Sequence, residues 1–256
     1  MKIGPRRLSK IFRAFLCFCH YRALFNMVLV CCNPFDFFMR YLFKTGLYPC
    51  DVKLRCGNSI VHAVAYTWDD ILTINEIFFR RDYPSSKNNR VIVDFGSNIG
   101  LSALFFAIQS PQSHLFLYEP LPLNTRRLKK HLAEFIERYT LHEKAVAPRG
   151  GIFEFGWEET GRYGGIGIDH GKSIPVIALN AKDELKKVID EYGKIDILKI
   201  DIESLEEDII ASVPISIWRC IDSVYVEYPF SSNPLWQTHV MCRKGELLTH
   251  FYIKKV

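Results

Sequence analysis

Short apolar runs alternate with amphipathic segments along the chain from residue 91 onward. VIVDF (91–95) is apolar at almost every position, which is typical of a strand buried on both faces of a sheet. Further runs of this kind follow at 114–120, 141–147, 195–203 and 223–228. Because the segments between them include apolar residues at helical spacing, the pattern predicts a doubly wound, mostly parallel α/β sheet.

The connecting segments are predicted from the same periodicity. Residues 150–179 indicate a glycine-punctuated β excursion, and the helix after it ends at Gly193. Past the fifth strand we expect one helix at 237–248 and one strand at 250–256. The two helices that follow the first and second strands are predicted from Leu101, Leu104, Phe105 and Ile108, and from Leu128, Leu132, Phe135, Ile136 and Tyr139.

Residues 1–84 are expected to form an N-terminal extension of helices and short strands, and 85–256 the main domain. The first 48 residues are helical in pattern and rich in aromatics. A hairpin is predicted to turn at Gly57–Asn58. The helix after it has Asp69 or Asp70 as its cap, with an apolar face formed by Ile71, Ile74, Ile77 and Phe78.

The formal charge is +5, too dilute for the clustered basic face of a nucleic-acid-binding protein, so we expect no nucleic-acid partner. Residues 14–32 are apolar, but His20, Arg22 and Asn26 are costly inside a bilayer. We expect helices packed on the domain; peripheral contact of residues 1–48 with the inner face of a membrane, and a span, are the alternatives. Eight cysteines without a Cys-x-x-Cys pair indicate reduced thiols in a cytoplasmic protein.

A glycine-containing turn, VIVDFGSNIG (91–100), lies at the carboxyl end of the first strand, where doubly wound sheets bind ligands. Gly96 permits close approach of a ligand, and Gly100 permits close packing of the next helix. The dinucleotide fingerprint Gly-x-Gly-x-x-Gly is absent, and the anion Asp94 disfavours a pyrophosphate but suits a positively charged ligand. Glu119, after the second strand, is the expected acceptor for ribose hydroxyls.

A ligand with a ribose, a positive centre and no required phosphate indicates S-adenosylmethionine. The plainer interpretations are an ordinary glycine-rich turn and a solvated loop glutamate.

Four motifs in this order and spacing carry a family resemblance: VIVDFGSNIG, YEPLPLN (118–124), EKAVA (143–147) and LKIDIE (198–203). Together they resemble the FkbM-type S-adenosylmethionine-dependent methyltransferases. The resemblance implies a Rossmann-like class I methyltransferase fold and O-methylation of a hydroxyl on a sugar, polyketide or related metabolite. By that resemblance the cofactor turn is lined by Asp94, Phe95, Gly96, Ser97, Asn98 and Gly100, Glu119 holds the ribose, Asn124 supports it, and Ala145 and Val146 border the adenine.

The LKIDIE stretch places charged residues at alternate positions of the fourth strand. Lys199, Asp201 and Glu203 are expected on one face, opening onto the site where an acceptor meets the methyl donor. Asp201 is the first choice for a carboxylate that accepts or orients a hydroxyl proton, and Glu203 the second. Lys199 would lower the pKa of a carboxylate or steer an anionic substrate, and Glu227 would contact substrate. The plainer interpretation is a charge cluster that only caps the strand. No metal site is predicted.

Two features depart from the family pattern. Ser204 stands where many relatives have glycine, and no histidine follows the fifth strand. The chain also lacks an evident second antiparallel strand at its C-terminus, so we expect a shortened sheet. These departures keep open a cofactor-binding or membrane-associated module without catalysis, while a nicotinamide-dependent oxidoreductase is disfavoured by the absent glycine. The acceptor, a small molecule or glycan, and the oligomeric state are not determined by the sequence.

Overall fold

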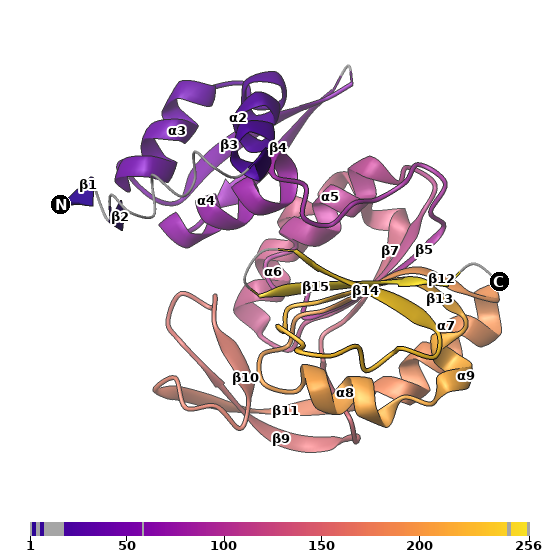
Figure 1. The fold of residues 1–256 in the computed structure, drawn as a ribbon. Helices are drawn as coiled ribbons and strands as arrows, with labels where there is room; N and C mark the ends of the chain where they lie inside the picture. The colour runs from indigo at the N-terminus through magenta and orange to yellow at the C-terminus, as the bar shows by residue number, and fades with distance from the viewer. Residues whose placement is uncertain (1, 4–5, 8–17, 58, 245–246, 255–256) are drawn as a thin grey trace. The chain divides into compact units, whose positions relative to one another are not determined.

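The computed structural model describes residues 2–3, 6–7, 18–57, 59–244 and 247–254 (Figure 1). Its contacts divide the chain into two compact units: Met1–Pro84, the N-terminal unit, and Ser85–Val256, the C-terminal unit.

The C-terminal unit is built on a seven-stranded sheet in the order β14-β15-β13-β12-β5-β6-β7. Its parallel strands are β5 (Val91–Phe95), β6 (His114–Tyr118), β7 (Tyr139–His142), β12 (Ile195–Ile200) and β13 (Ile221–Val226). The predicted doubly wound, mostly parallel α/β sheet is confirmed. Strand order reverses between β5 and β12, which places the expected ligand site at their carboxyl ends.

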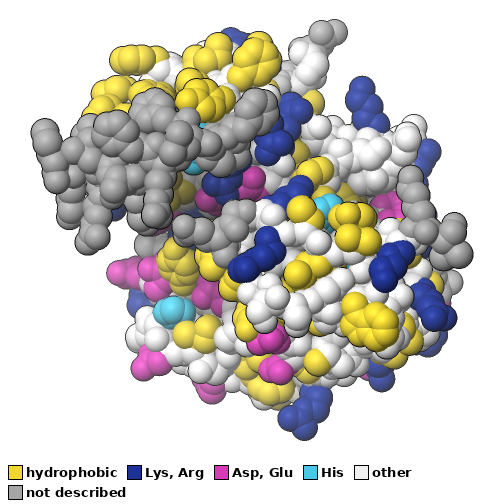
Figure 2. Space-filling view, viewed as in Figure 1, with side chains coloured by type: hydrophobic (Ala, Val, Ile, Leu, Met, Phe, Trp, Pro, Cys, Tyr) yellow, Lys and Arg dark blue, Asp and Glu magenta, His cyan; other side chains and the backbone are white. Residues whose placement is uncertain are grey.

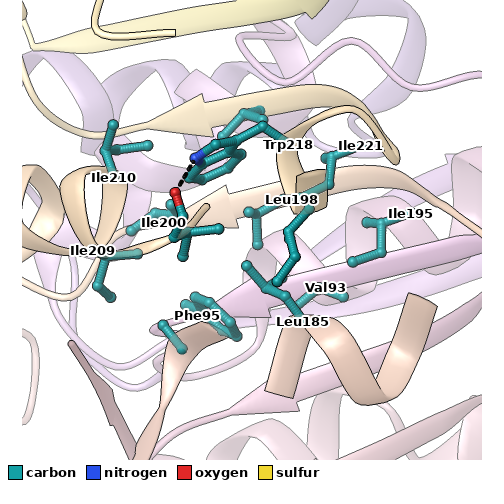
Figure 3. Packing of buried hydrophobic residues seen from close by; sticks show 14 of the residues in the cluster. Val93, Phe95, Leu185, Ile195, Leu198, Ile200, Ile209, Ile210, Trp218 and Ile221 are labelled. Carbon is teal, nitrogen blue, oxygen red and sulfur yellow. Dashed lines mark hydrogen bonds between the residues drawn. The ribbon is translucent and has the colours of Figure 1, made fainter. Parts of the chain in front are cut away.

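Helices cover both faces of this sheet (Figure 1). They are α5 (Leu101–Gln109), α6 (Pro122–His131), α7 (Ala181–Tyr192), α8 (Glu206–Ser212) and α9 (Ile215–Trp218). Val93 and Phe95 of β5 pack in one buried cluster with Leu185 of α7 and Trp218 of α9 (Figure 3). The Trp218 indole N–H donates to the Val213 carbonyl at 2.9 Å, so its one polar group is satisfied inside the core.

The sheet closes with an antiparallel pair, β14 (His239–Lys244) and β15 (Leu248–Ile253). β15 also pairs antiparallel with β13. The predicted helix at 237–248 and the expected shortened sheet are therefore wrong. Pairing with distant strands, which the local sequence does not encode, fixes this segment as extended.

The third predicted strand is split between two sheets. β7 stays in the main sheet, whereas β8 (Ala145–Ala147) pairs with β11 (Lys172–Asn180). β9 (Gly151–Trp157) and β10 (Gly164–Ile166) complete a second sheet of four strands in the order β10-β9-β11-β8. The glycine-punctuated excursion is thus a small sheet of its own.

Two predicted elements end earlier than expected. α6 ends at His131, a 3-10 turn η2 (Ala133–Arg138) follows, and Ile136 is 62% exposed. Tyr139 belongs to β7 because it pairs with Leu115 of β6. β12 ends at Ile200 instead of residue 203, since the chain turns sharply beyond it.

The N-terminal unit contains α2 (Phe18–Val30), α3 (Pro34–Phe43), the hairpin β3 (Cys50–Cys56) and β4 (Ser59–Ala65), α4 (Trp68–Ile74) and a π-helical turn η1 (Asn75–Phe79). The described residues near the start form two short strands, β1 (Lys2–Ile3) and β2 (Arg6–Arg7), where helix was expected; residues 8–17 of that predicted helical stretch lie outside the described residues.

The pairing of β3 with β4 confirms the predicted hairpin, of whose turn Asn58 lies outside the described residues. The predicted apolar face is buried as expected, with Ile71 and Ile74 in α4 and Ile77 and Phe78 in η1. The cap is different: Thr67 is the N-cap, and Asp70 sits at the third helical position of a capping box. No helix within the described ranges is long and apolar enough to cross a bilayer.

Candidate functional site

The turn between β5 and α5 depends on glycine. Gly96 has φ +82°, and a Cβ there would lie 1.7 Å from the Asp201 carbonyl oxygen. Gly100, with φ +86°, begins α5, and a Cβ there would lie 2.8 Å from Leu128 Cγ of α6. Both positions combine a left-handed backbone with close contact, so side chains are excluded for two reasons.

Glu119 closes the same turn from β6. Its carboxylate accepts hydrogen bonds from the backbone N–H of Asn98 (2.9 Å) and Leu121 (3.0 Å), and from the Asn124 side-chain amide (3.4 Å). Burial raises the pKa of Glu119 to about 7, although these donors favour the charged form. Ser97 Oγ braces the turn by donating to the Asp94 carbonyl at 3.0 Å.

A buried charge pair connects β5 with β12. Lys199 Nζ lies 3.2 Å from Asp94 Oδ1, and the two residues are neighbours in the strand register. Asp94 Oδ2 accepts from the Ser102 hydroxyl at 2.6 Å. Asp94 is 0% exposed, so its charge is balanced inside the protein and is not the open anion expected from the sequence. The physical reason is the cross-strand lysine, which sequence spacing cannot place.

Lys199 also contacts what lies beyond β12. Its ammonium group is 3.0 Å from Asp201 Oδ2 and donates to the Gly96 carbonyl at 3.1 Å. Burial alone lowers the pKa of Lys199, but the carboxylates of Asp201, Asp94 and Glu227 outweigh it and the pKa is raised. Lys199 is therefore a charged, buried anchor for the turn.

Glu203 follows a different geometry from its two predicted partners. Because the strand ends at Ile200, Glu203 does not continue the alternation with Lys199 and Asp201. Glu203 and Ser204 have φ +53° and +78°, both left-handed without being glycine. The Glu203 side chain is 32% exposed, and its carboxylate lies 3.9 Å from His170 Nε2. Burial, with the nearby Asp201 and Glu206, raises its pKa to about 7.

The loop between β9 and β10 is held by hydrogen bonds from the turn after β5 and from α6. Three consecutive carbonyl oxygens accept side-chain hydrogen bonds: Thr160 from Arg127 (2.6 Å), Gly161 from Asn124 (2.7 Å) and Arg162 from Asn98 (2.9 Å). Two of these donors, Asn98 and Asn124, are residues predicted to bind the cofactor. The loop 158–163 therefore lies directly against the predicted ribose-binding residues.

The remaining predicted residues fall outside this constellation. Phe95 is fully buried in the core and packs edge-on against Tyr118, with ring centroids 5.1 Å apart. Ala145 and Val146 are buried in β8 of the second sheet. Glu227 lies just after β13, is exposed, and donates its backbone N–H to the Ile200 carbonyl. Its negative charge still acts on Lys199.

Sequence reasoning missed His170, Arg127 and the loop 158–163. His170 Nε2 is a buried atom that makes no hydrogen bond in the described part of the chain. The signal that was available is the density of glycines in the excursion: a Cβ at Gly165 would lie 3.0 Å from the Glu203 carbonyl oxygen. The glycines of the excursion thus indicate that β10 approaches the 201–205 turn closely. The hydrogen bonds accepted by the backbone carbonyls of residues 160–162 leave no such signal in the sequence.

The polar atoms of the turn fit a nucleoside cofactor. A carboxylate has about four lone-pair sites, and the hydrogen bonds that Glu119 accepts from Asn98, Leu121 and Asn124 use three of them. Asn124 Oδ1 is buried and unpartnered among the described atoms, so a further acceptor is available beside it. In the part of the chain that the structure describes, no three His, Cys, Asp or Glu side chains lie close enough together to hold a metal ion.

The chain matches the family model of the methyltransferase FkbM domain over residues 94–241. A methyltransferase structure from Geobacter sulfurreducens is 13% identical over 66% of this chain and 73% of that one, with a TM-score of 0.39. A putative caffeoyl-CoA O-methyltransferase from Staphylococcus aureus is 13% identical over 72% and 91%, with a TM-score of 0.40.

A fibrillarin from Aeropyrum pernix, solved with natively bound S-adenosyl-L-methionine, is 11% identical over 66% of this chain and 67% of its own, with a TM-score of 0.39. A search of curated protein sequences gives no match.

Proposed function

Because this chain belongs to the methyltransferase FkbM domain family, with S-adenosylmethionine as cofactor, we propose that it methylates a hydroxyl oxygen with Glu203 as general base. The acceptor class is a sugar, glycan, lipid-linked or secondary-metabolite hydroxyl. The observation that carries the proposal is the environment of Glu203: a half-buried carboxylate with a pKa raised to about 7, held on a left-handed backbone beside the cofactor turn.

The two predicted bases are separated by their partners. Asp201, the first choice from the sequence, is held by Lys199 at 3.0 Å and serves the turn. The Glu203 carboxylate lies 3.9 Å from His170 Nε2, and the positive charge of Arg162 lowers its pKa without cancelling the effect of burial. A carboxylate with a pKa close to the working pH is the better proton acceptor, because it is ionised yet binds a proton appreciably. We therefore assign the base to Glu203 and an anchoring role to Asp201.

Each group then has a defined part. When bound, S-adenosylmethionine supplies an electrophilic methyl group on a positively charged sulfur. Glu119 accepts hydrogen bonds from ribose hydroxyls, and the loop 158–163 excludes water from that side. Glu203 takes the proton that the acceptor hydroxyl loses. Proximity of the acceptor oxygen to the methyl carbon supplies much of the acceleration.

The alternative of a non-catalytic module loses one of its two motivations, since the antiparallel pair β14–β15 closes the sheet. Binding of a nicotinamide dinucleotide finds no support in a turn that lacks the third glycine of the dinucleotide fingerprint.

The test combines binding with product analysis. Calorimetric titration with S-adenosylmethionine should give saturable binding to the wild-type chain and to Glu203→Gln, and much weaker binding to Glu119→Gln. Cell extract incubated with the cofactor labelled in its methyl group should then yield a labelled product with the wild type and not with Glu203→Gln. Mass spectrometry and carbon NMR of that product tell an O-methyl from an N-methyl group. A labelled base or amino group, or binding that Glu119→Gln leaves unchanged, would overturn the proposal.

A further inference from the structure

One face of α2 is apolar and exposed from Tyr21 to Leu29. Its side chains recur at spacings of three and four residues, which places them on one stripe of the helix. They are Tyr21, Leu24, Phe25, Val28 and Leu29, exposed by 51, 49, 65, 55 and 54%. Soluble proteins commonly expose single apolar side chains, but a continuous stripe of this kind marks an interaction surface.

The opposite face of α2 already anchors the helix. Ala23, Asn26 and Met27 are buried, and the Asn26 side-chain amide donates to the Phe79 carbonyl of η1 at 2.6 Å. These contacts hold α2, and with it the exposed stripe, against the described part of the N-terminal unit. The helix is therefore ordered before it binds, which removes the entropic cost of ordering a free helix.

The helix that follows carries further exposed aromatics. In α3, Phe35 is 73% and Phe38 36% exposed, and Leu47, just past its end, is 87% exposed. Figure 2 shows apolar side chains gathered at the top of the view, over the N-terminal unit. We call the stripe of α2 together with these three residues the apolar patch.

The net charge of the N-terminal unit indicates which kind of surface the apolar patch binds. The N-terminal unit has twelve Lys and Arg against six Asp and Glu, whereas residues 85–256 have 21 against 22. Within residues 1–50 the single acidic residue is Asp36, and its carboxylate is paired with Arg40 at 2.8 Å. Apolar and aromatic side chains on a basic background are the combination that binds an anionic lipid surface.

The length of α2 determines whether it could span a bilayer or only lie in the plane of its surface. Thirteen residues of helix extend about 20 Å, less than the ~30 Å of a bilayer's hydrocarbon core. The helix also keeps its other face inside a folded unit, so it cannot insert across the membrane. We propose that the apolar patch docks in the plane of an anionic membrane surface, and that this chain works as a peripheral membrane protein. This proposal is independent of the methyl-transfer chemistry, because it uses none of the residues assigned to it.

Vesicle flotation with the full chain tests the proposal. Vesicles containing phosphatidylglycerol should carry the protein upward, vesicles of phosphatidylcholine alone should carry much less, and high salt should release it because the lysines and arginines are screened. The double variant Phe25→Asp, Leu29→Asp should lose about a hundredfold in partitioning, since burial of each apolar side chain is worth about tenfold. Circular dichroism and urea unfolding establish that the variant is folded.

Ile136→Asp is the matched control, because Ile136 is 62% exposed, like Phe25, but belongs to η2 of the C-terminal unit. It should float as the wild type does. Equal flotation with neutral vesicles, equal loss in the control, or no flotation at all would overturn the proposal. Sedimentation that shows a dimer broken by the double variant would assign the apolar patch to a second copy of the chain, and would overturn it as well.

Discussion

The turns that follow β5 and β12 lie side by side at the carboxyl edge of the sheet. Both contain residues with left-handed backbone, but they place different kinds of residue in that conformation. After β5 the chain uses Gly96, Asn98 and Gly100, and after β12 it uses Glu203 and Ser204. A non-glycine residue in this region costs about 1–2 kcal/mol, although asparagine adopts it more readily than most. The first turn therefore relies on glycine and asparagine, which tolerate this conformation, whereas the second retains a glutamate carboxylate in spite of strain, which is typical of functional positions.

The two turns are also joined into one structure. The Asp201 N–H donates to the Phe95 carbonyl at 3.0 Å, and Lys199 Nζ donates to the Gly96 carbonyl. Gly96 leaves the space that the Asp201 carbonyl occupies. The glycine turn therefore supports the strained one, and changes in the first should be felt in the second.

The largest effect is expected from Gly96→Ala. The new Cβ would lie 1.7 Å from the Asp201 carbonyl oxygen, so both turns must move apart, and calorimetry should detect no binding of S-adenosylmethionine. Gly96→Val should act in the same way with a larger clash.

Gly193→Ala is the matched control for this change. Gly193 has almost the same φ, +83°, but a Cβ there meets nothing within 4 Å. It should lose about 1–2 kcal/mol of stability and keep cofactor binding. If both variants bind equally well, close contact of the two turns is not what the site needs.

The link between the turns is tested by Lys199→Met. This change leaves the Asp94 carboxylate buried without its cation, which should cost about 3–5 kcal/mol in the free energy of unfolding measured with urea. The double variant Lys199→Met, Asp94→Asn should regain part of that loss, because the fully buried charge of Asp94 is then removed as well, and the carboxylate of Asp201, whose side chain is 31% exposed, keeps contact with solvent. A single variant that loses less than about 1 kcal/mol would show that the pair is solvated rather than buried.

Much of the first turn was predictable from sequence because its causes are local. An apolar run followed by Gly96 and Gly100 encodes a buried strand and a tight turn within ten residues. The second turn was predicted less well: alternation of Ile200 and Ile202 with charges suggested three more strand residues. The strand ends at Ile200 instead, and the Lys199–Asp94 pair that organises its end joins positions 105 apart in the chain.

Other errors have the same origin. Residues 239–244 form a strand because of pairing with β15, which in turn pairs with β13. The hydrogen bonds that hold the loop 158–163 are accepted by three backbone carbonyls, which any sequence supplies. Only the donors, Arg127, Asn124 and Asn98, were therefore open to prediction. Contacts between distant segments decided each case.

The variant Glu203→Gln tests whether the turn after β12 supplies the catalytic base. If Glu203 is the base, kcat should fall about a hundredfold while cofactor affinity is kept. In the wild type, kcat measured at saturating cofactor, where titration of Glu119 no longer limits cofactor binding, should rise with pH through about 7, where the Glu203 carboxyl loses its proton, and the variant should lose this dependence. A pH profile that persists in Glu203→Gln would move the base to another group.

The same raised pKa bears on stability with a defined sign. The folded protein binds this proton more tightly than the unfolded chain does, so the stabilisation is fully present below the unfolded pKa of about 4.3 and is lost as pH rises through about 7. Because the side chain is 32% exposed, solvent screening keeps this contribution small.

The smallest effect, and the most direct test of the contrast between the turns, is expected from Ser204→Gly. Ser204 is exposed and has φ +78°, so glycine would relieve the left-handed strain without removing a buried contact. The gain is reduced because glycine has more freedom in the unfolded chain, which leaves a net stabilisation of about 0.5–1 kcal/mol. Ser204→Ala removes the same hydroxyl but keeps the strain, so it should not be stabilised. Equal urea midpoints for the two variants would mean that the turn carries no strain at this residue, and that Glu203 alone among the left-handed positions after β12 is held at a cost.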